Sequence, residues 1–132
     1  VLLIFAQATA ESADPQLRAQ GRSIAEAYMD EILLQRYCED PDAGCSAETA
    51  GGGAETGESR GEFDDVFDYD AIAGESPPVD QFGNPLTGLD AYTVDVAVGG
   101  DPQAGDRATI EVRVRHDAGV LDYRLDSERE NY

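Results

Sequence analysis

An apolar run opens this chain and leads directly into a segment with helical periodicity. Residues 1–6 read VLLIFA, and apolar residues then recur at helical spacing as far as Tyr37. A helix that crosses a membrane needs about 20 apolar residues, whereas Gln7, Thr9 and Glu11 interrupt this run early. Because the sequence also lacks an initiator Met, we expect the run to be the lower part of an apolar helix that continues upstream of Val1. The alternative is the buried end of an ordinary helix.

The rest of this segment predicts an amphipathic helix over residues 15–37. Asp14 suits the N-cap position and Pro15 the first helical position. One apolar stripe follows at spacings of 7, 4 and 4 residues, and it consists of Leu17, Ile24, Tyr28 and Ile32. If the helix instead ran unbroken from Val1, Pro15 would remove one backbone hydrogen bond and kink it. Both interpretations place a bend or a break near Pro15.

The charge balance excludes several classes of function. The chain has 132 residues, which suits one domain, and its 28 acidic and 9 basic side chains give a formal net charge of −19. Such a surface repels nucleic-acid backbones and anionic lipid headgroups, so we expect no nucleic acid among the partners. All nine basic residues are Arg. The absence of Lys removes Schiff-base chemistry and the phosphate-binding lysine of a P-loop.

Cys38 and Cys45 are the only cysteines, and three acidic residues lie between them. Those acids disfavour a reactive thiolate, and a zinc site lacks ligands because the single His is distant in the sequence. We therefore expect a disulfide that closes a short loop, worth roughly 2–2.5 kcal/mol in the chain-entropy model. A disulfide places the domain in an oxidising compartment, the periplasm or the cell exterior.

The stretch between Cys45 and Gly61 predicts a loop, because Ala, Gly, Thr, Ser and Glu dominate it without apolar periodicity. It contains one match to a catalytic motif, since residues 57–61 read GESRG and fit the G-x-S-x-G pattern of serine hydrolases. A small hydrolase that uses Ser59 with His116 is therefore the remote alternative function. The motif requires a strand before the serine and a helix after it, and neither flank supplies one. His116 continues the alternation of a predicted strand, which favours a structural role.

An acidic segment with interspersed apolar residues follows at residues 61–74. Its apolar members predict an irregular segment that is pinned to the core, and they are Phe63, Val66, Phe67, Tyr69 and Ile72. Its carboxylates are Asp64, Asp65, Asp68 and Asp70. Carboxylate oxygens are ligands for Ca²⁺, which takes roughly 6–8 of them. The EF-hand pattern fails, because Ile72 occupies the fifth position counted from Asp68. A calcium site of another type is one interpretation of the cluster, and a solvated acidic face is the other.

The last third of the chain predicts an antiparallel sheet over residues 91–126. Three runs alternate apolar with polar residues, and their apolar members are Tyr92, Val94, Val96 and Val98; Ile110, Val112 and Val114; and Leu121, Tyr123 and Leu125. Turn residues between the runs predict a meander in which an Arg on the exposed face lies opposite Asp95. One long N-terminal helix packed on a small three- to four-stranded antiparallel sheet makes an α+β roll. Residues 38–90 form a loop-rich region between the two.

These features together resemble the type IV pilin-like family. The resemblance rests on the apolar N-terminal run, the helical segment IAEAYMDEILL at residues 24–34, the Cys38/Cys45 loop, the segment FDDVFDY at residues 63–69 and the C-terminal meander. The family's processing site and the glutamate after it would lie upstream of Val1. In this interpretation residues 1–14 are the lower part of an assembly and membrane helix, and residues 15–132 are the globular domain.

The resemblance implies a non-enzymatic subunit of a pilus or of a related pseudopilus. It implies a location in the inner membrane and periplasm before assembly and in a filament afterwards, with other pilin subunits and the assembly machinery as partners. Helix packing is expected from Val1, Leu2, Leu3, Ile4, Phe5, Leu17, Ile24, Tyr28 and Ile32. No cofactor is expected apart from the possible calcium. A secreted calcium-dependent binding module that uses residues 64–70 is the alternative function.

Overall fold

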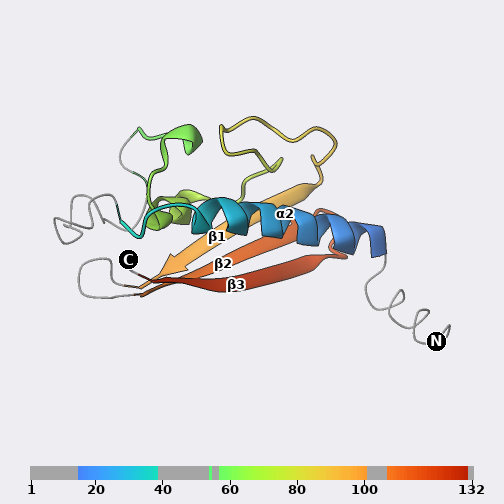
Figure 1. Cartoon of the computed structure of the whole chain (residues 1–132). Coiled ribbons are helices and arrows are strands. Elements are labelled where there is room, and N and C mark those ends of the chain that lie inside the picture. Colours follow the sequence, from blue (N-terminus) through green and yellow to red (C-terminus); the bar gives the residue numbers. More distant parts are fainter. Residues whose placement is uncertain (1–14, 39–53, 55–56, 101–106, 131–132) are drawn as a thin grey trace.

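The computed structural model describes residues 15–38, 54, 57–100 and 107–130. It is an α+β domain in which an N-terminal helix packs on one face of a three-stranded antiparallel sheet, as the sequence predicts (Figure 1). The elements in chain order are α2 (Pro15–Leu33), the 3₁₀ helices η1 (Arg60–Glu62) and η2 (Val66–Ala71), and the strands β1 (Tyr92–Gly99), β2 (Arg107–His116) and β3 (Asp122–Glu130).

The sheet is a meander with strand order β1-β2-β3, which confirms the predicted connectivity. All three predicted runs lie within or next to these strands, but β2 begins at Arg107 and β3 continues to Glu130. The extra length escapes the hydrophobic pattern because the added residues are polar, yet backbone pairing continues from Arg115↔Asp122 to Arg107↔Glu130. Asp95 lies opposite Arg113 in the register, so the predicted cross-strand charge pair is confirmed.

The core lies between α2 and the inner face of the sheet. Apolar residues recur with a period of 3.6 along the helix and of 2 along the strands. One stripe of the helix therefore packs against alternate residues of the strands. The helix contributes the buried residues Ile24, Ala25, Tyr28, Met29 and Ile32, and the strands contribute Tyr92, Val94, Val96, Ala108, Ile110, Val112 and Val114. Each strand therefore keeps one polar face outside the core.

α2 begins at Pro15 as predicted but ends at Leu33, four residues before the predicted end at Tyr37. The last turn tightens, with N–H groups of Leu34 and Gln35 donating to carbonyls three residues earlier. The chain then leaves the helical path because the carbonyl of Arg36 accepts a hydrogen bond from Val66 N–H at 2.9 Å. This bond directs Tyr37 and Cys38 into the core, where they are 1% and 0% exposed.

The irregular segment before the sheet is pinned to the core and to the edge of β1. Val66, Phe67, Tyr69 and Ile72 are buried, as predicted, and Phe63 is partly buried. Glu75 forms one antiparallel bridge with Val94, and Val96 N–H donates to the carbonyl of Ile72 at 2.9 Å. This segment covers the β1 edge without forming a fourth strand.

Candidate functional site

A buried guanidinium lies where the irregular segment meets α2. The Arg60 side chain is only 6% exposed. Its Nε donates to Glu31 Oε2 at 2.8 Å and its Nη2 donates to Glu31 Oε1 at 3.1 Å, which is a two-point contact with one carboxylate. Its Nη1 donates to Glu75 Oε2 at 3.1 Å. Arg60 therefore joins the helix, η1 and the strand-edge segment at one point.

Two tyrosines enclose this guanidinium. The Arg60 Cζ lies 4.7 Å from the ring centroid of Tyr28 and 5.5 Å from that of Tyr69. The Tyr28 hydroxyl donates to Glu75 and accepts from Val79 N–H at 2.8 Å. Burial, and then the hydrogen bond to Glu75, raises the pKa of Tyr28 above its usual value. The hydroxyl therefore stays protonated, as the hydrogen bond to Glu75 requires.

The electrostatics of the cluster hold Arg60 charged. Burial alone would lower the pKa of Arg60, but the hydrogen bond and the charge of Glu31, with the charge of Glu75, outweigh it, and the pKa is raised. The cluster thus supplies a fixed cation between two carboxylates. Its geometry fits a structural role, in which the ion pair of Arg60 with Glu31 attaches η1 to α2.

The sequence alone does not predict this cluster. Arg60 is the last residue of the predicted loop and lies within the G-x-S-x-G match, whereas in the structure it is the first residue of η1. A signal was present, because Arg60 is the only basic residue between Arg36 and Arg107 in a stretch rich in acids. A lone cation among many carboxylates is a candidate for a multi-point ion pair.

The hydrolase alternative finds no support in the positions of its two residues. Ser59 is the N-cap of η1, and its hydroxyl donates to Glu62 Oε2 at 2.7 Å. His116 ends β2, accepts from Ala118 N–H at 3.1 Å through Nδ1, and packs edge-on against Tyr92. No hydrogen bond joins Ser59 to His116 within the described ranges. Each side chain instead makes a hydrogen bond within its own local turn, Ser59 with Glu62 and His116 with Ala118.

The predicted acidic cluster is divided into groups with different surroundings. Asp65 and Asp68 are both only 1% exposed, so a solvated face is wrong for these two. Asp65 Oδ1 accepts from the N–H groups of Phe67 and Asp68 at 2.8 and 3.2 Å. Asp68 Oδ2 accepts from the N–H groups of Asp64 and Asp65 at 2.9 and 3.1 Å. The pair caps η2 reciprocally, a pattern that the spacing Asp-x-x-Asp could have indicated.

Burial of this capping pair changes its titration. Burial first, and then the charge of Asp68, raises the pKa of Asp65 to about 7, although two backbone hydrogen bonds act in the opposite direction. Asp70 lies apart and is exposed, and its Oδ1 accepts from Val98 N–H at 2.8 Å. It serves to hold the segment on β1.

Three carboxylates converge beside the capping pair. One oxygen each from Glu58, Asp64 and Asp68 lies within 4.8 Å of the other two. Of the four predicted calcium ligands, the structure brings together Asp64 and Asp68 and replaces the others with Glu58. A calcium ion takes roughly 6–8 oxygen ligands, so three carboxylates would need backbone or water oxygens to complete a site.

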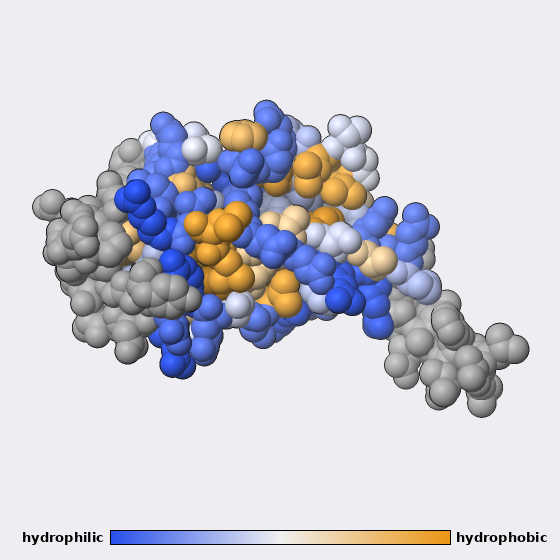
Figure 2. All heavy atoms as spheres, in the orientation of Figure 1, coloured by the Kyte–Doolittle hydropathy of each residue, from blue (hydrophilic) through white to orange (hydrophobic). Residues whose placement is uncertain are grey.

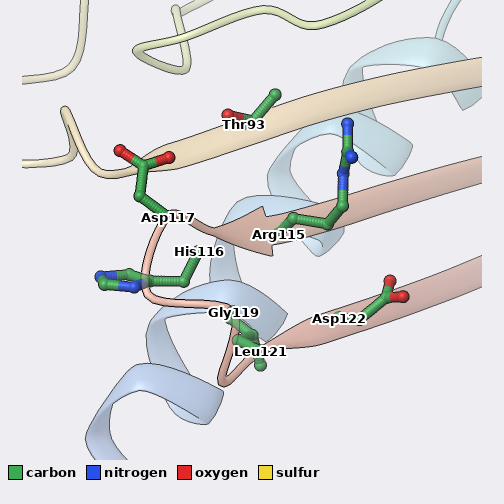
Figure 3. A pocket seen from close by; sticks show the side chains of 7 residues that line it. All are labelled: Thr93, Arg115, His116, Asp117, Gly119, Leu121 and Asp122. Carbon is green, nitrogen blue, oxygen red and sulfur yellow. The ribbon is translucent and has the colours of Figure 1, made fainter.

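A shallow hollow of about 420 Å³ lies at the end of the sheet where β2 turns into β3 (Figure 3). It is lined by Thr93, Arg115, His116, Asp117, Gly119, Leu121 and Asp122. Arg115 pairs with Asp95 beside it, while Figure 3 shows His116 directed away from Arg115.

The predicted assembly residues on α2 lie on its inner face. Ile24, Tyr28 and Ile32 are at most 5% exposed and pack in the domain's own core, so they are unavailable to a neighbouring subunit. Leu17 is partly buried against the same core. Val1, Leu2, Leu3, Ile4 and Phe5 lie outside the described residues, as does Asp14. The sheet occupies this stripe, so Ile24, Tyr28 and Ile32 do their packing within the domain.

A shallow, mostly apolar groove runs along the side of α2 that borders Leu89. About 290 Å³ of space is lined by Gln16, Ala19, Gln20, Ser23, Ile24 and Leu89. Figure 2 shows hydrophobic residues between hydrophilic ones on the face that carries α2. Leu34, just past the helix end, is 86% exposed. Of these residues, Ala19 and Ser23 on α2 and Leu34 beyond its end are exposed to another molecule.

The predicted disulfide stays a prediction. Cys38 is fully buried next to the core, and Cys45 lies outside the described residues. An intact bond would lower the mass of the unreduced protein by two hydrogens relative to the reduced protein, which mass spectrometry can resolve.

Comparison with protein-family models, curated proteins and solved structures gave no match to this chain. Within the described residues, no helix has both the length and the apolar character needed to cross a membrane. The functional argument therefore depends on the sequence and the structure themselves.

Proposed function

We propose that this chain is a non-enzymatic structural subunit of a type IV pilin-like filament. The specific assignment is a minor pilin of a pilus of the mannose-sensitive haemagglutinin (MSHA) type, or a subunit of a related pseudopilus. One observation supports it most: α2 lies lengthwise on a three-stranded meander, and in the sequence the apolar residues 1–6 lie upstream of it, separated from Pro15 by residues 7–14. An apolar N-terminal segment joined to a helix that is the spine of a domain suits a subunit that first enters a membrane and then packs against other helices.

The two faces of α2 suit this division of roles. The inner stripe stabilises the domain, while the outer face carries the exposed small residues Ala19, Ser23 and Ala27 at intervals of four. Small residues on one face let the backbone of a second helix approach closely. In this proposal residues 1–14 supply the remaining assembly surface, and the partners are other pilin subunits and the assembly machinery.

The proposed locations follow from this role. The subunit is held in the inner membrane with its domain in the periplasm, and after assembly it is part of an extracellular pilus or a pseudopilus. The predicted Cys38–Cys45 disulfide suits such an oxidising compartment. The formal net charge of −19 opposes binding to nucleic acid.

A pair of substitutions tests the proposal by separating assembly from folding. Ile24→Asp places a charge in the core at a position that is 5% exposed, and an unpaired buried charge costs several kcal/mol, enough to unfold a domain of about 5–15 kcal/mol stability. Leu3→Asp should leave the melting temperature of the 132-residue chain within a few degrees of wild type. In cells that make the complete gene product, Leu3→Asp should block incorporation into filaments.

The matched control is Gln7→Asp, which places the same charge in the same N-terminal stretch but replaces a residue that is already polar. It should retain more filament incorporation than Leu3→Asp. If Leu3→Asp unfolds the chain as severely as Ile24→Asp, the opening run belongs to the core and the proposal loses its main support. Coding sequence upstream of Val1 without a Gly-Phe-Thr-Leu-Ile-Glu-like start would also count against it.

A calcium-dependent binding module is the second candidate, favoured by the convergence of Glu58, Asp64 and Asp68. Asp64 is exposed, so Asp64→Asn should remove a ligand without disturbing the core. If calcium binds, it should raise the melting temperature of the wild type, because a ligand selective for the folded state stabilises it. Asp70→Asn is the matched control, since Asp70 lies outside the three-carboxylate group. The absence of a thermal shift and of heat in a calcium titration would eliminate this candidate.

A further inference from the structure

On the outer face of the sheet, β2 and β3 carry two adjacent rows of like charges, while Asp95 on β1 lies opposite Arg113. In the register of β2 with β3, Arg113 lies opposite Arg124, and Glu111 lies opposite Asp126. Like charges directly opposite each other across a strand pair are unfavourable. The two rows are two residues apart along the strands, so a positive row and a negative row lie next to each other on one exposed surface.

The positive row is only partly neutralised within the chain. Asp122 pairs with Arg113 at 2.7 Å and lies 3.9 Å from Arg124. For the negative row, no ion pair within residues 107–130 or the other described ranges reaches Glu111 or Asp126. Figure 1 shows α2 on one face of the sheet and no labelled element on the other. The charge pattern on that other face therefore remains open to a partner.

We infer that the outer face of the sheet binds the same face of a second copy of this chain. A two-fold axis parallel to the sheet and perpendicular to the strands, placed between the two rows, brings the positive row of one copy over the negative row of the other. Arg113 then meets Glu111 of the second copy, and Arg124 meets Asp126 of the second copy. Because the axis is two-fold, each contact occurs twice, as in the isologous interfaces of homodimers.

The size of the face limits the strength of this contact. Three strands about 4.8 Å apart and about eight residues long, at about 3.3 Å per residue, span roughly 370 Å² on each copy. Two such faces bury roughly 750 Å², below the roughly 1,000 Å² typical of stable complexes. The dimer is therefore weak and depends on concentration, and it strengthens where copies are held close together.

The overall charge sets how salt acts on this dimer. Each copy carries a formal net charge of −19, so two copies repel each other at long range. This repulsion is screened beyond about 8 Å at 0.15 M ionic strength and reaches about 30 Å at 0.01 M. Pairs in contact across the interface are screened less. The dimer fraction should therefore rise when salt increases from about 0.01 M to about 0.15 M.

Sedimentation equilibrium of the 132-residue chain, up to about 1 mM protein, tests the inference with a charge-swap series. Arg113→Glu alone sets Glu against Glu111 of the second copy twice, and should weaken dimerisation by about tenfold or more. Glu111→Arg alone should weaken it similarly. The double variant Arg113→Glu/Glu111→Arg restores opposite charges at both contacts and should dimerise like the wild type. It also has the net charge of the wild type, so recovery cannot come from a change in overall charge.

Arg18→Glu is the matched control, because it makes the same change in net charge at an exposed position on α2. It should weaken dimerisation much less than Arg113→Glu, and melting temperatures check that every variant is folded. A protein that stays monomeric throughout this range overturns the inference. Equal effects of Arg18→Glu and Arg113→Glu, or failure of the double variant to recover, also overturn it. The inference does not depend on the pilin proposal, since neither filament assembly nor residues 1–14 enter the test.

Discussion

Arg60 is the residue through which the irregular segment is attached to α2. Replacing it with Met keeps much of its apolar volume but leaves Glu31 and Glu75, whose side chains are 12% and 24% exposed, without their cation. Breaking a buried ion pair by removing one partner typically costs about 3–5 kcal/mol. We therefore expect Arg60→Met to lower the free energy of unfolding by about that amount in urea denaturation. Arg60→Lys should recover only part of the loss, because an ammonium cannot make the two-point contact with Glu31.

An exposed ion pair on α2 provides the comparison. Arg22 pairs with Glu26 at 2.8 Å, and their side chains are 66% and 48% exposed. Exposed pairs of this kind at i,i+4 contribute little to stability. Arg22→Met should therefore change the free energy of unfolding far less than Arg60→Met. If Arg60→Met lowers the free energy of unfolding as little as Arg22→Met does, the Arg60 cluster does not attach η1 to α2.

Asp65 should make the stability of the domain depend on pH. Its pKa is raised from 3.8 to about 7 by burial and by the charge of Asp68, so the folded state binds this proton more tightly than the unfolded state. The stability contributed by the protonated form is fully present below pH about 4 and is lost as the pH rises through about 7. Thermal melting of the wild type from pH 4 to pH 8 should show this decline.

Asp65→Asn isolates that contribution. An amide oxygen can still accept from Phe67 N–H and Asp68 N–H, but it does not titrate. The acidic surface also charges as the pH rises, in both proteins alike. The informative quantity is therefore the difference in melting temperature between variant and wild type, which should favour the variant increasingly from pH 5 to pH 7.5. A difference that is constant over this range would mean that Asp65 has an ordinary pKa when folded.

At the scale of elements, the sequence predicts what depends on periodicity and misses what depends on contacts between distant segments. Pro15 and the stripe of α2 mark the helix, and alternation marks three strands. The helix end at Leu33 depends on the bond from Val66 N–H to Arg36, which no local pattern encodes. The Arg60 cluster joins residues that are separated by 15 to 47 positions in the sequence. Composition does not distinguish a buried aspartate from a solvated one, so it does not predict the capping pair Asp65 and Asp68.

A glycine lets α2 pack closely on Leu121, in the connection between β2 and β3. Gly21 is buried inside the helix, and a Cβ built there would lie 2.4 Å from Leu121 Cδ2. Glycine in a helix is otherwise unfavourable by about 1 kcal/mol relative to Ala, so close packing offsets that cost. We expect Gly21→Val to lower the free energy of unfolding by about 1–3 kcal/mol through overpacking. Chemical denaturation measures this directly.

A double-variant cycle shows whether the contact with Leu121 is the cause. In a Leu121→Ala background the Gly21→Val substitution has space, so its cost should be smaller than in the wild type. Ala27→Val, at an exposed position of the same helix, controls for the lower helix propensity of Val and should cost less than about 1 kcal/mol. Equal costs of Gly21→Val in both backgrounds would exclude Leu121 as the source of the strain.

For the whole molecule, the distribution of charge separates two kinds of electrostatic contribution. Arg60 is buried and its two carboxylates are only partly exposed, so dissolved ions have limited access to them. The remaining ion pairs of the described residues involve side chains that are about a third to two thirds exposed, and pairs of this kind contribute about 0–1 kcal/mol each. The repulsion among the excess acidic groups opposes the stabilisation from these ion pairs, because the formal net charge is −19.

Salt should therefore stabilise this protein. Screening weakens both the exposed ion pairs and the general repulsion, but the repulsion acts among many unpaired carboxylates over distances longer than about 8 Å, where salt is most effective. The melting temperature should rise as sodium chloride increases from about 0.01 M to about 0.5 M, measured at a protein concentration low enough to keep the chain monomeric. Sodium and potassium chloride should act equally, because screening depends on ionic strength and not on the identity of the cation. If the melting temperature falls with salt, the attraction within ion pairs outweighs the repulsion from the excess negative charge. The carboxylates of the acidic surface would then be arranged so that they do not repel each other in the folded state.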